Sequence, residues 1–171
     1  MFGRRSRSKL REQRVLNQIF SNVGLFFKSL FYSSDARKSQ GPCAQRPGWR
    51  SSTDLLHADT GTKIDLSVMP LEGVARCRAA WARLIGRQTC VVHGNPNNPG
   101  NVRITSNRVA LIDWDESHVD VPDLDLVLPY NAAGLDGDAL EIAGQASAAW
   151  EAAVCWEDEY AIRRLSEVRA V

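Results

Sequence analysis

The pattern of hydrophobic and polar positions divides the chain into three regions. In residues 1 to 32, apolar side chains recur at three- and four-residue spacing from Leu10 to Phe27, which predicts an amphipathic helix. The next stretch, residues 33 to 48, is polar and contains glycine and proline, which is typical of a linker. Apolar periodicity returns after it, so we predict that residues 49 to 171 form the folded lobe.

Within this lobe the pattern predicts helices at both ends and short strands between them. A helix is expected to begin at Pro70 and to end at Gly86, because proline favours the first helical turn and glycine the end of a helix. A second helical region begins near Asp138, with a break near Cys155. Residues 89 to 92 and 109 to 113 favour strands, and residues 101 to 105 are expected to pair with the latter as a hairpin. The predicted fold class is α/β, mainly α.

Charge separates the first region from the rest of the 171-residue chain. Residues 1 to 50 carry 11 Lys/Arg and 2 Asp/Glu, whereas residues 51 to 171 carry 10 Lys/Arg and 18 Asp/Glu. A basic amphipathic segment is suited to weak contact with an anionic membrane surface, and a docking helix or a tail is the alternative for residues 1 to 32. We expect no specific nucleic-acid partner. The chain contains no 18-residue apolar run, so we expect no transmembrane helix. Its 4 cysteines form no CxxC pair and are typical of thiols in a reducing cytosol, so we expect a cytoplasmic protein.

The residues that carry chemistry are concentrated between positions 90 and 126. A short apolar strand ends at His93, and a polar loop rich in glycine and proline follows as far as Asn101. The second strand of the expected hairpin ends at Asp113. Reactive groups are often carried by loops at strand ends, where a rigid scaffold positions them. Asn101 and Asp113 are therefore candidate ligands for Mg²⁺, which prefers carboxylate and amide oxygens.

Three motifs in this region resemble those of the aminoglycoside phosphotransferases and their relatives, the choline, homoserine and fructosamine kinases. HGNPNNPGN at residues 93 to 101 is similar to the family's HGDxxxxN catalytic loop. IDWD at residues 112 to 115 resembles its IDW[ED] metal motif, and DVPDLDL at residues 120 to 126 resembles its DPxxDL motif. The resemblance implies the C-terminal lobe of a protein-kinase-like fold, with a small β-hairpin at the catalytic loop.

The same resemblance implies a function and a set of site residues. The function is phosphoryl transfer to a hydroxyl of a small molecule, with ATP and Mg²⁺ as cofactors. Asn101 and Asp113 would bind the metal, and His93 and Asn95 would belong to the catalytic loop. Asp125 would brace that loop from the helix that follows.

The chain departs from the family pattern in three ways. Asn95 stands where the family has the aspartate that accepts the substrate proton, and an amide is no base at neutral pH. Asn95 and Asn101 are six residues apart, against five in the family motif. Residues 1 to 48 contain no glycine-rich nucleotide loop and no VAIK-like strand, so the N-terminal lobe is expected to be missing.

These departures leave three functions open. The first is a truncated and degenerate phosphotransferase with weak or no activity. The second is a working kinase of a small hydroxyl compound, in which an oligomer or a partner chain replaces the missing lobe. The third is a non-catalytic binding or interaction module on a kinase-like scaffold. The motifs favour the second, whereas Asn95 favours the first and third.

Overall fold

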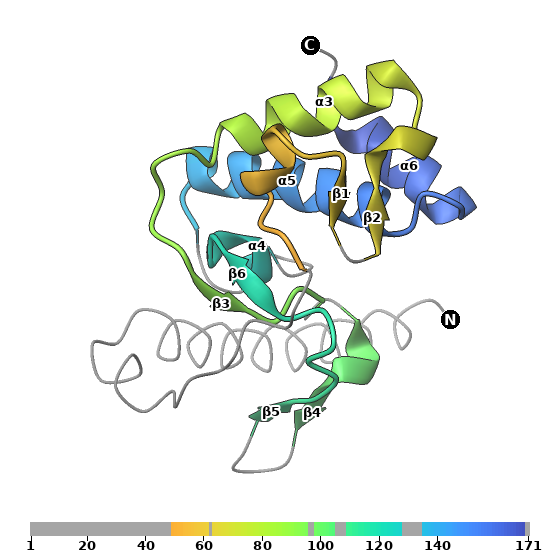
Figure 1. The fold of residues 1–171 in the computed structure, drawn as a ribbon. Helices are drawn as coiled ribbons and strands as arrows, with labels where there is room; N and C mark the ends of the chain where they lie inside the picture. The colour runs from red at the N-terminus through yellow and green to blue at the C-terminus, as the bar shows by residue number, and fades with distance from the viewer. Residues whose placement is uncertain (1–48, 62, 96–97, 105–108, 128–134, 170–171) are drawn as a thin grey trace, which may run out of the picture.

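The computed structural model describes residues 49–61, 63–95, 98–104, 109–127 and 135–169 (Figure 1). The predicted basic helix over residues 1 to 32 and the predicted linker over residues 33 to 48 lie outside the described residues. The helices are η1 (Asp54–Leu56), η2 (Leu66–Val68), α3 (Leu71–Ala82), η3 (Pro99–Asn101), α4 (Asp123–Leu126), α5 (Gly137–Val154) and α6 (Glu159–Glu167). The strands are β1 (Thr60–Gly61), β2 (Ile64–Asp65), β3 (Cys90–Val92), β4 (Val102–Ile104), β5 (Val109–Leu111) and β6 (His118–Asp120).

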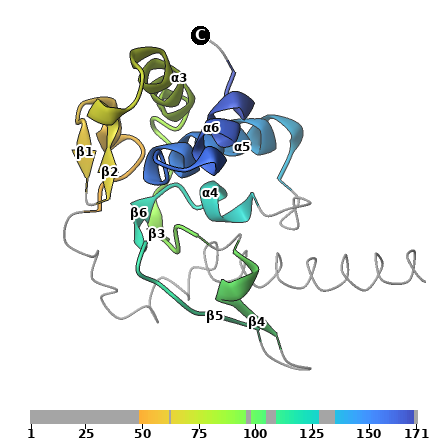
Figure 2. The same cartoon turned by 90° about the vertical axis from the view of Figure 1, so that its right-hand side faces the viewer.

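Helices α3, α5 and α6 form one layer, and the β4–β5 hairpin lies at the opposite end of the molecule (Figures 1 and 2). Pro70 precedes α3, and Gly86, with a φ of 78°, follows its last turn. Asp136 caps α5 by accepting a hydrogen bond from the backbone N–H of Ala139 at 2.8 Å. The chain leaves the helical path after Val154 and resumes it at α6, which confirms the predicted break near Cys155.

The core lies mainly between α3 and α5, because α5 presents a face of alanines that lets a large side chain approach its backbone. Trp81 is fully buried, and its indole N–H donates to the carbonyl of Ala146 at 3.2 Å. Cys77, also fully buried, lies one turn before Trp81 on α3 and contacts the carbonyl of Ala149. This packing fixes α5, whose far side forms one wall of the candidate site.

Two short antiparallel sheets carry the motif residues. The first pairs β3 with β6, with Cys90 opposite Asp120 and Val92 opposite His118. The second pairs β4 with β5, with Val102 opposite Leu111, which confirms the predicted hairpin. The pattern did not predict β6, which pairs with a strand almost thirty residues earlier in the chain.

The segment from Trp49 to Ser52 is attached to the lobe by buried polar contacts. Ser52 donates to the carboxylate of Asp120 through both its backbone N–H and its hydroxyl, each at 2.7 Å. The ring of His118 is stacked on Trp150, with centroids 4.3 Å apart, and on Trp49, with centroids 6.0 Å apart. These contacts connect the start of the described chain, β6 and α5.

A mainly helical lobe with small antiparallel sheets agrees with the predicted fold class. Its kinase-like identity and the missing N-terminal lobe stay predictions. Across the described ranges, no helix has both the length and the apolar character needed to cross a membrane.

Candidate functional site

One buried carboxylate on α4 holds the loop that follows β3. His93 and Gly94 come directly after this strand, and their backbone N–H groups donate to the two oxygens of Asp125 at 2.5 and 3.1 Å. Asp125 is 1% exposed. Its burial raises the pKa of the carboxyl group, and the two N–H bonds oppose that rise. The loop-bracing contact expected of Asp125 is therefore present.

The side chain of His93 is directed into the loop and not into a cavity. The ring is fully buried, and Nε2 lies 2.8 Å from the carbonyl oxygen of Ile112, which can only accept a hydrogen bond. Nδ1 therefore remains the acceptor for the backbone N–H of Asn95, at 3.3 Å. Trp114 covers the ring, with centroids 4.7 Å apart. His93 thus positions Asn95 through its two ring nitrogens.

Gly94 allows the loop to approach the segment after β5. Its φ of 91° is a conformation that side chains with a Cβ rarely adopt. A Cβ at this position would lie 2.5 Å from the carbonyl oxygen of Glu116. Glycine therefore permits a direct contact between the catalytic-loop backbone and the backbone of Glu116.

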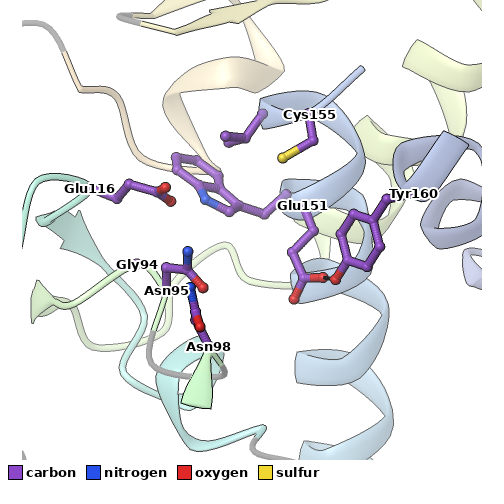
Figure 3. A pocket seen from close by; sticks show the side chains of 9 residues that line it. Gly94, Asn95, Asn98, Glu116, Glu151, Cys155 and Tyr160 are labelled. Carbon is purple, nitrogen blue, oxygen red and sulfur yellow. Dashed lines mark hydrogen bonds between the residues drawn. The ribbon is translucent and has the colours of Figure 1, made fainter. Parts of the chain in front are cut away.

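Asn95 faces a cavity of about 360 Å³ between the loop and α5 (Figure 3). Glu116 also lines this cavity. Burial and the neighbouring Asp115 raise the pKa of Glu116, while Lys63 and the side chain of Asn95 act in the opposite direction. The predicted catalytic position thus opens onto a space of small-molecule size, beside a second carboxylate.

The opposite wall of the cavity comes from the end of α5 and the start of α6. Glu151 accepts hydrogen bonds from the hydroxyl of Tyr160 and from Nε of Arg164, the latter at 2.8 Å. Burial and the Glu151 hydrogen bond raise the pKa of Tyr160 to about 12, so its hydroxyl stays protonated at neutral pH. Burial also raises the pKa of the Cys155 thiol. Neither Tyr160 nor Cys155 is therefore a ready nucleophile.

Trp150 belongs to the same wall of the cavity. The residue is 4% exposed and lines the cavity. Its indole nitrogen is buried and has no hydrogen-bond partner among the described residues. A buried donor left without a partner costs about 1–3 kcal/mol.

The β4–β5 hairpin brings Asn101 and Asp113 to the same end of its ladder. The backbone N–H of Ile112 donates to the carbonyl of Asn101 at 2.9 Å, so Asp113 is one residue beyond the position opposite Asn101. The side-chain nitrogen of Asn101 donates to the carbonyl of Asn95 at 3.0 Å. The extra residue in the loop therefore leaves Asn101 in contact with the loop backbone.

The backbone at Asp113 has a conformation that is uncommon outside glycine. Its φ is 65°, and it is the one residue other than glycine with a positive φ in the described part of the chain. Aspartate tolerates this region better than most residues, at a cost of about 1 kcal/mol. Strained backbone is concentrated at functional sites, and here it turns an exposed carboxylate at the end of β5.

Comparison with models of protein families identifies the family of this chain. The model of the phosphotransferase enzyme family matches residues 34–161, which is more than half of the chain. The chain belongs to this phosphotransferase family. No curated protein and no solved structure matched it. The family recognised from the motifs at residues 93 to 126 is thereby confirmed.

Kinases of this family generally use ATP and Mg²⁺. Two residues of this chain carry side-chain oxygens of the kind that bind such an ion. Asn101 and Asp113 would hold it through one amide oxygen and one carboxylate, the hard oxygen ligands that Mg²⁺ prefers. Among the described residues there is no group of three or more His, Cys, Asp or Glu that could bind a metal. A two-residue site suits Mg²⁺, because this ion keeps several waters and shares its ligands with phosphates.

Replacing Asp113 separates its metal role from its backbone strain. The unfolding free energy of Asp113→Gly should be about 1 kcal/mol larger than that of Asp113→Ala, because glycine adopts the positive φ freely. We expect millimolar Mg²⁺ and ATP to raise the melting temperature of the parent, and both variants should lose this rise. Urea unfolding and thermal melts, with and without the ligands, measure the two effects. An undiminished shift in Asp113→Gly would contradict the metal assignment.

The sequence predicted the loop residues on one side of the cavity but not the residues of α5 and α6 on the opposite side. Glu116 directly follows the expected metal motif and carries no motif position of its own. Trp150, Glu151 and Tyr160 lie in a helical region where apolar and charged residues are typical of packing and of solvated surface. The signal that would have grouped them is spatial, because they meet Asn95 only in the folded lobe.

Proposed function

We propose that this chain transfers a phosphoryl group from ATP to a hydroxyl of a small molecule, and that it does so slowly. The observation that carries the proposal is the position of Asn95. Its side chain faces the cavity, and its backbone carbonyl contacts Asn101 at the end of the candidate metal hairpin. A substrate hydroxyl in the cavity would therefore reach the side chain of Asn95, whose backbone carbonyl binds the candidate metal ligand Asn101.

Slow turnover follows from the chemistry of the amide. Asn95 can orient a hydroxyl by hydrogen bonding, but it cannot accept the proton at neutral pH. Positioning and charge stabilisation account for most catalysis of phosphoryl transfer, so activity is reduced and not abolished. A general base typically contributes about 10²–10⁴-fold to the rate. Asn101 and Asp113 would hold the Mg²⁺ that neutralises phosphate charge when bound.

The polar groups of the cavity favour an acceptor that carries amino groups as well as hydroxyls. Glu116 and Glu151 line the cavity with carboxylates, which attract cationic and hydroxyl groups. Charge-assisted hydrogen bonds of this kind are stronger than neutral ones. The proposed substrates are therefore small amino alcohols and amino sugars.

The Asn95→Asp substitution tests the function. We expect it to raise kcat for ATP-dependent phosphorylation by about tenfold, because it restores a carboxylate at the family's base position. The assay follows ADP release against a panel of amino alcohols and aminoglycosides. Asn98→Asp is the matched control, because it adds the same charge to the same cavity. It also keeps the acceptor oxygen that binds the backbone N–H of Gly100.

The Asn98→Asp control distinguishes the effect of a base at position 95 on kcat from the effect of added negative charge. An equal rise in both variants would indicate that added negative charge, and not a base at position 95, changes the rate. If folded parent and Asn95→Asp proteins both fail to phosphorylate every member of the panel, phosphotransferase activity is excluded for these substrates. Calorimetric binding of an amino alcohol without turnover would then support the alternative, a non-catalytic binding module, which the amide at position 95 favours.

A further inference from the structure

Glu116 is a cavity-lining carboxylate beside the catalytic position. Its side chain and that of Asn95 line the same cavity (Figure 3). Glu116 is half-buried, so it is partly shielded from bulk water while one side faces the cavity. A hydroxyl group that Asn95 orients would therefore lie within reach of the Glu116 carboxylate.

The backbone of Glu116 is fixed on two sides. Gly94 contacts its carbonyl group so closely that a Cβ at position 94 would lie 2.5 Å from the oxygen. The same oxygen accepts a hydrogen bond from Nδ1 of His118 at 2.7 Å. His118 is itself stacked against Trp150. The Glu116 carboxylate thus extends from a rigid anchor point, as a positioned catalytic group requires.

The electrostatic surroundings of Glu116 make it a stronger base than a surface glutamate. Burial is the largest cause of its raised pKa, and the charge of Asp115 adds to it. Lys63, the side chain of Asn95 and His118 act against this rise. A carboxyl group whose pKa moves toward the working pH is a better proton acceptor.

The other glutamate of the cavity is less available. Glu151 accepts hydrogen bonds from Tyr160 and Arg164, and its carboxylate forms an ion pair with Arg164 at 2.8 Å. An ion pair stabilises the ionised form and weakens the carboxylate as a base. Glu116 has no ion pair within 4.0 Å among the described residues and lines the cavity together with Asn95.

We propose that Glu116 is the general base of this site and supplies the proton acceptor that Asn95 lacks. The inference rests on the proposed phosphotransferase function. The substrate oxygen forms a bond to the terminal phosphorus of the nucleoside triphosphate while its proton moves to the Glu116 carboxylate. The bond from that phosphorus to the bridging oxygen breaks, and the diphosphate leaves with the electron pair. Glu116 then releases the proton to water.

The test compares the parent, Glu116→Gln, Asn95→Asp and the double variant Asn95→Asp/Glu116→Gln. Glu116→Gln should lower kcat by about 100-fold with little change in KM, because the amide keeps the shape but cannot accept a proton. In the double variant, the aspartate introduced at position 95 should restore kcat to within about tenfold of the parent. Glu72→Gln, which removes an exposed glutamate on α3 outside the cavity lining, should leave kcat unchanged.

The pH dependence of kcat gives a second readout that a purely structural role would not change. Glu116 must be ionised to accept a proton, so parent activity should fall on acidification through the raised pKa of this carboxyl group. This acidic limb should be absent from Glu116→Gln. It should persist in Glu116→Asp, which keeps a carboxylate on a shorter side chain, and this variant covers the case in which glutamine disturbs folding.

The outcomes distinguish this inference from the function on which it rests. Activity of Glu116→Gln equal to the parent overturns the role of Glu116 and leaves the phosphotransferase function standing. If the parent is inactive and Asn95→Asp is active, the role of Glu116 is likewise overturned and the phosphotransferase function stands. If the parent and Asn95→Asp are both folded and inactive, the proposed function fails, and the role of Glu116 fails with it.

Discussion

The Asp125→Ala variant is expected to lose about 4 kcal/mol of unfolding free energy, the largest effect of any substitution considered for this protein. The substitution removes the acceptors of two backbone N–H groups, those of His93 and Gly94. His93 is fully buried, and each buried donor without a partner costs about 1–3 kcal/mol. The cavity left by the side chain adds to this loss.

Urea denaturation followed by far-UV circular dichroism measures this loss. Asp136→Ala is the matched control, because Asp136 also accepts a backbone N–H, but at an exposed helix cap. We expect the control to lose about 1 kcal/mol. Similar losses in the two variants would show that Asp125 does not brace the loop.

The Gly94→Ala variant is expected to lose about 3 kcal/mol of unfolding free energy and most of its activity. Two costs combine, the positive φ of 91° and the approach of the new Cβ to within 2.5 Å of the Glu116 carbonyl oxygen. The first costs about 1–2 kcal/mol, and the overlap adds about 1–3 kcal/mol. The clash is with backbone, so the loop and Glu116 must separate.

Gly86→Ala isolates the second cost. Gly86 has a similar φ of 78°, but a Cβ there would have no atom within 4 Å. This control should lose only about 1–2 kcal/mol and keep the activity of the parent. Equal losses at positions 86 and 94 would mean that conformation alone accounts for the effect and that the Glu116 contact is not tight.

Local patterns predicted the elements whose stability is local. Pro70 and Gly86 marked the region of α3, and a break was expected near Cys155, where α5 ends. The hairpin of β4 and β5 followed from alternating apolar positions on either side of a turn. In each case the residues that define the element are neighbours in the sequence, so their pattern is visible without a structure.

Elements held by distant contacts were not predictable in this way. Strand β6 has only three residues, two of them the buried polar residues His118 and Asp120. His118 is accommodated because Trp150 stacks on it, and Asp120 because Ser52 donates to it. The sequence pattern contains no sign of these partners. The burial of Trp49 was not predictable either, because its neighbours in the sequence are polar and the predicted linker precedes it.

The residues of the candidate site also fall into two groups, those found from local motifs and those that depend on distant contacts. His93, Asn101 and Asp113 were found because they occupy motif positions, although their proposed roles in metal binding and catalysis stay predictions. Glu116 and Trp150 were missed, because their relevance depends on the fold that brings α5 opposite the loop. Motif positions hold the residues whose chemistry a family shares. The opposite wall of the cavity, formed by α5 and α6, consists of residues outside the motifs.

The contacts that fix Glu116 act on its carbonyl group and not on its side chain. Gly94 and His118 both meet this one oxygen, so the loop position does not depend on which side chain residue 116 carries. Position 116 can consequently change identity during evolution without disturbing the scaffold. A substitution at position 116 should therefore change the chemistry of the cavity and leave the loop in place.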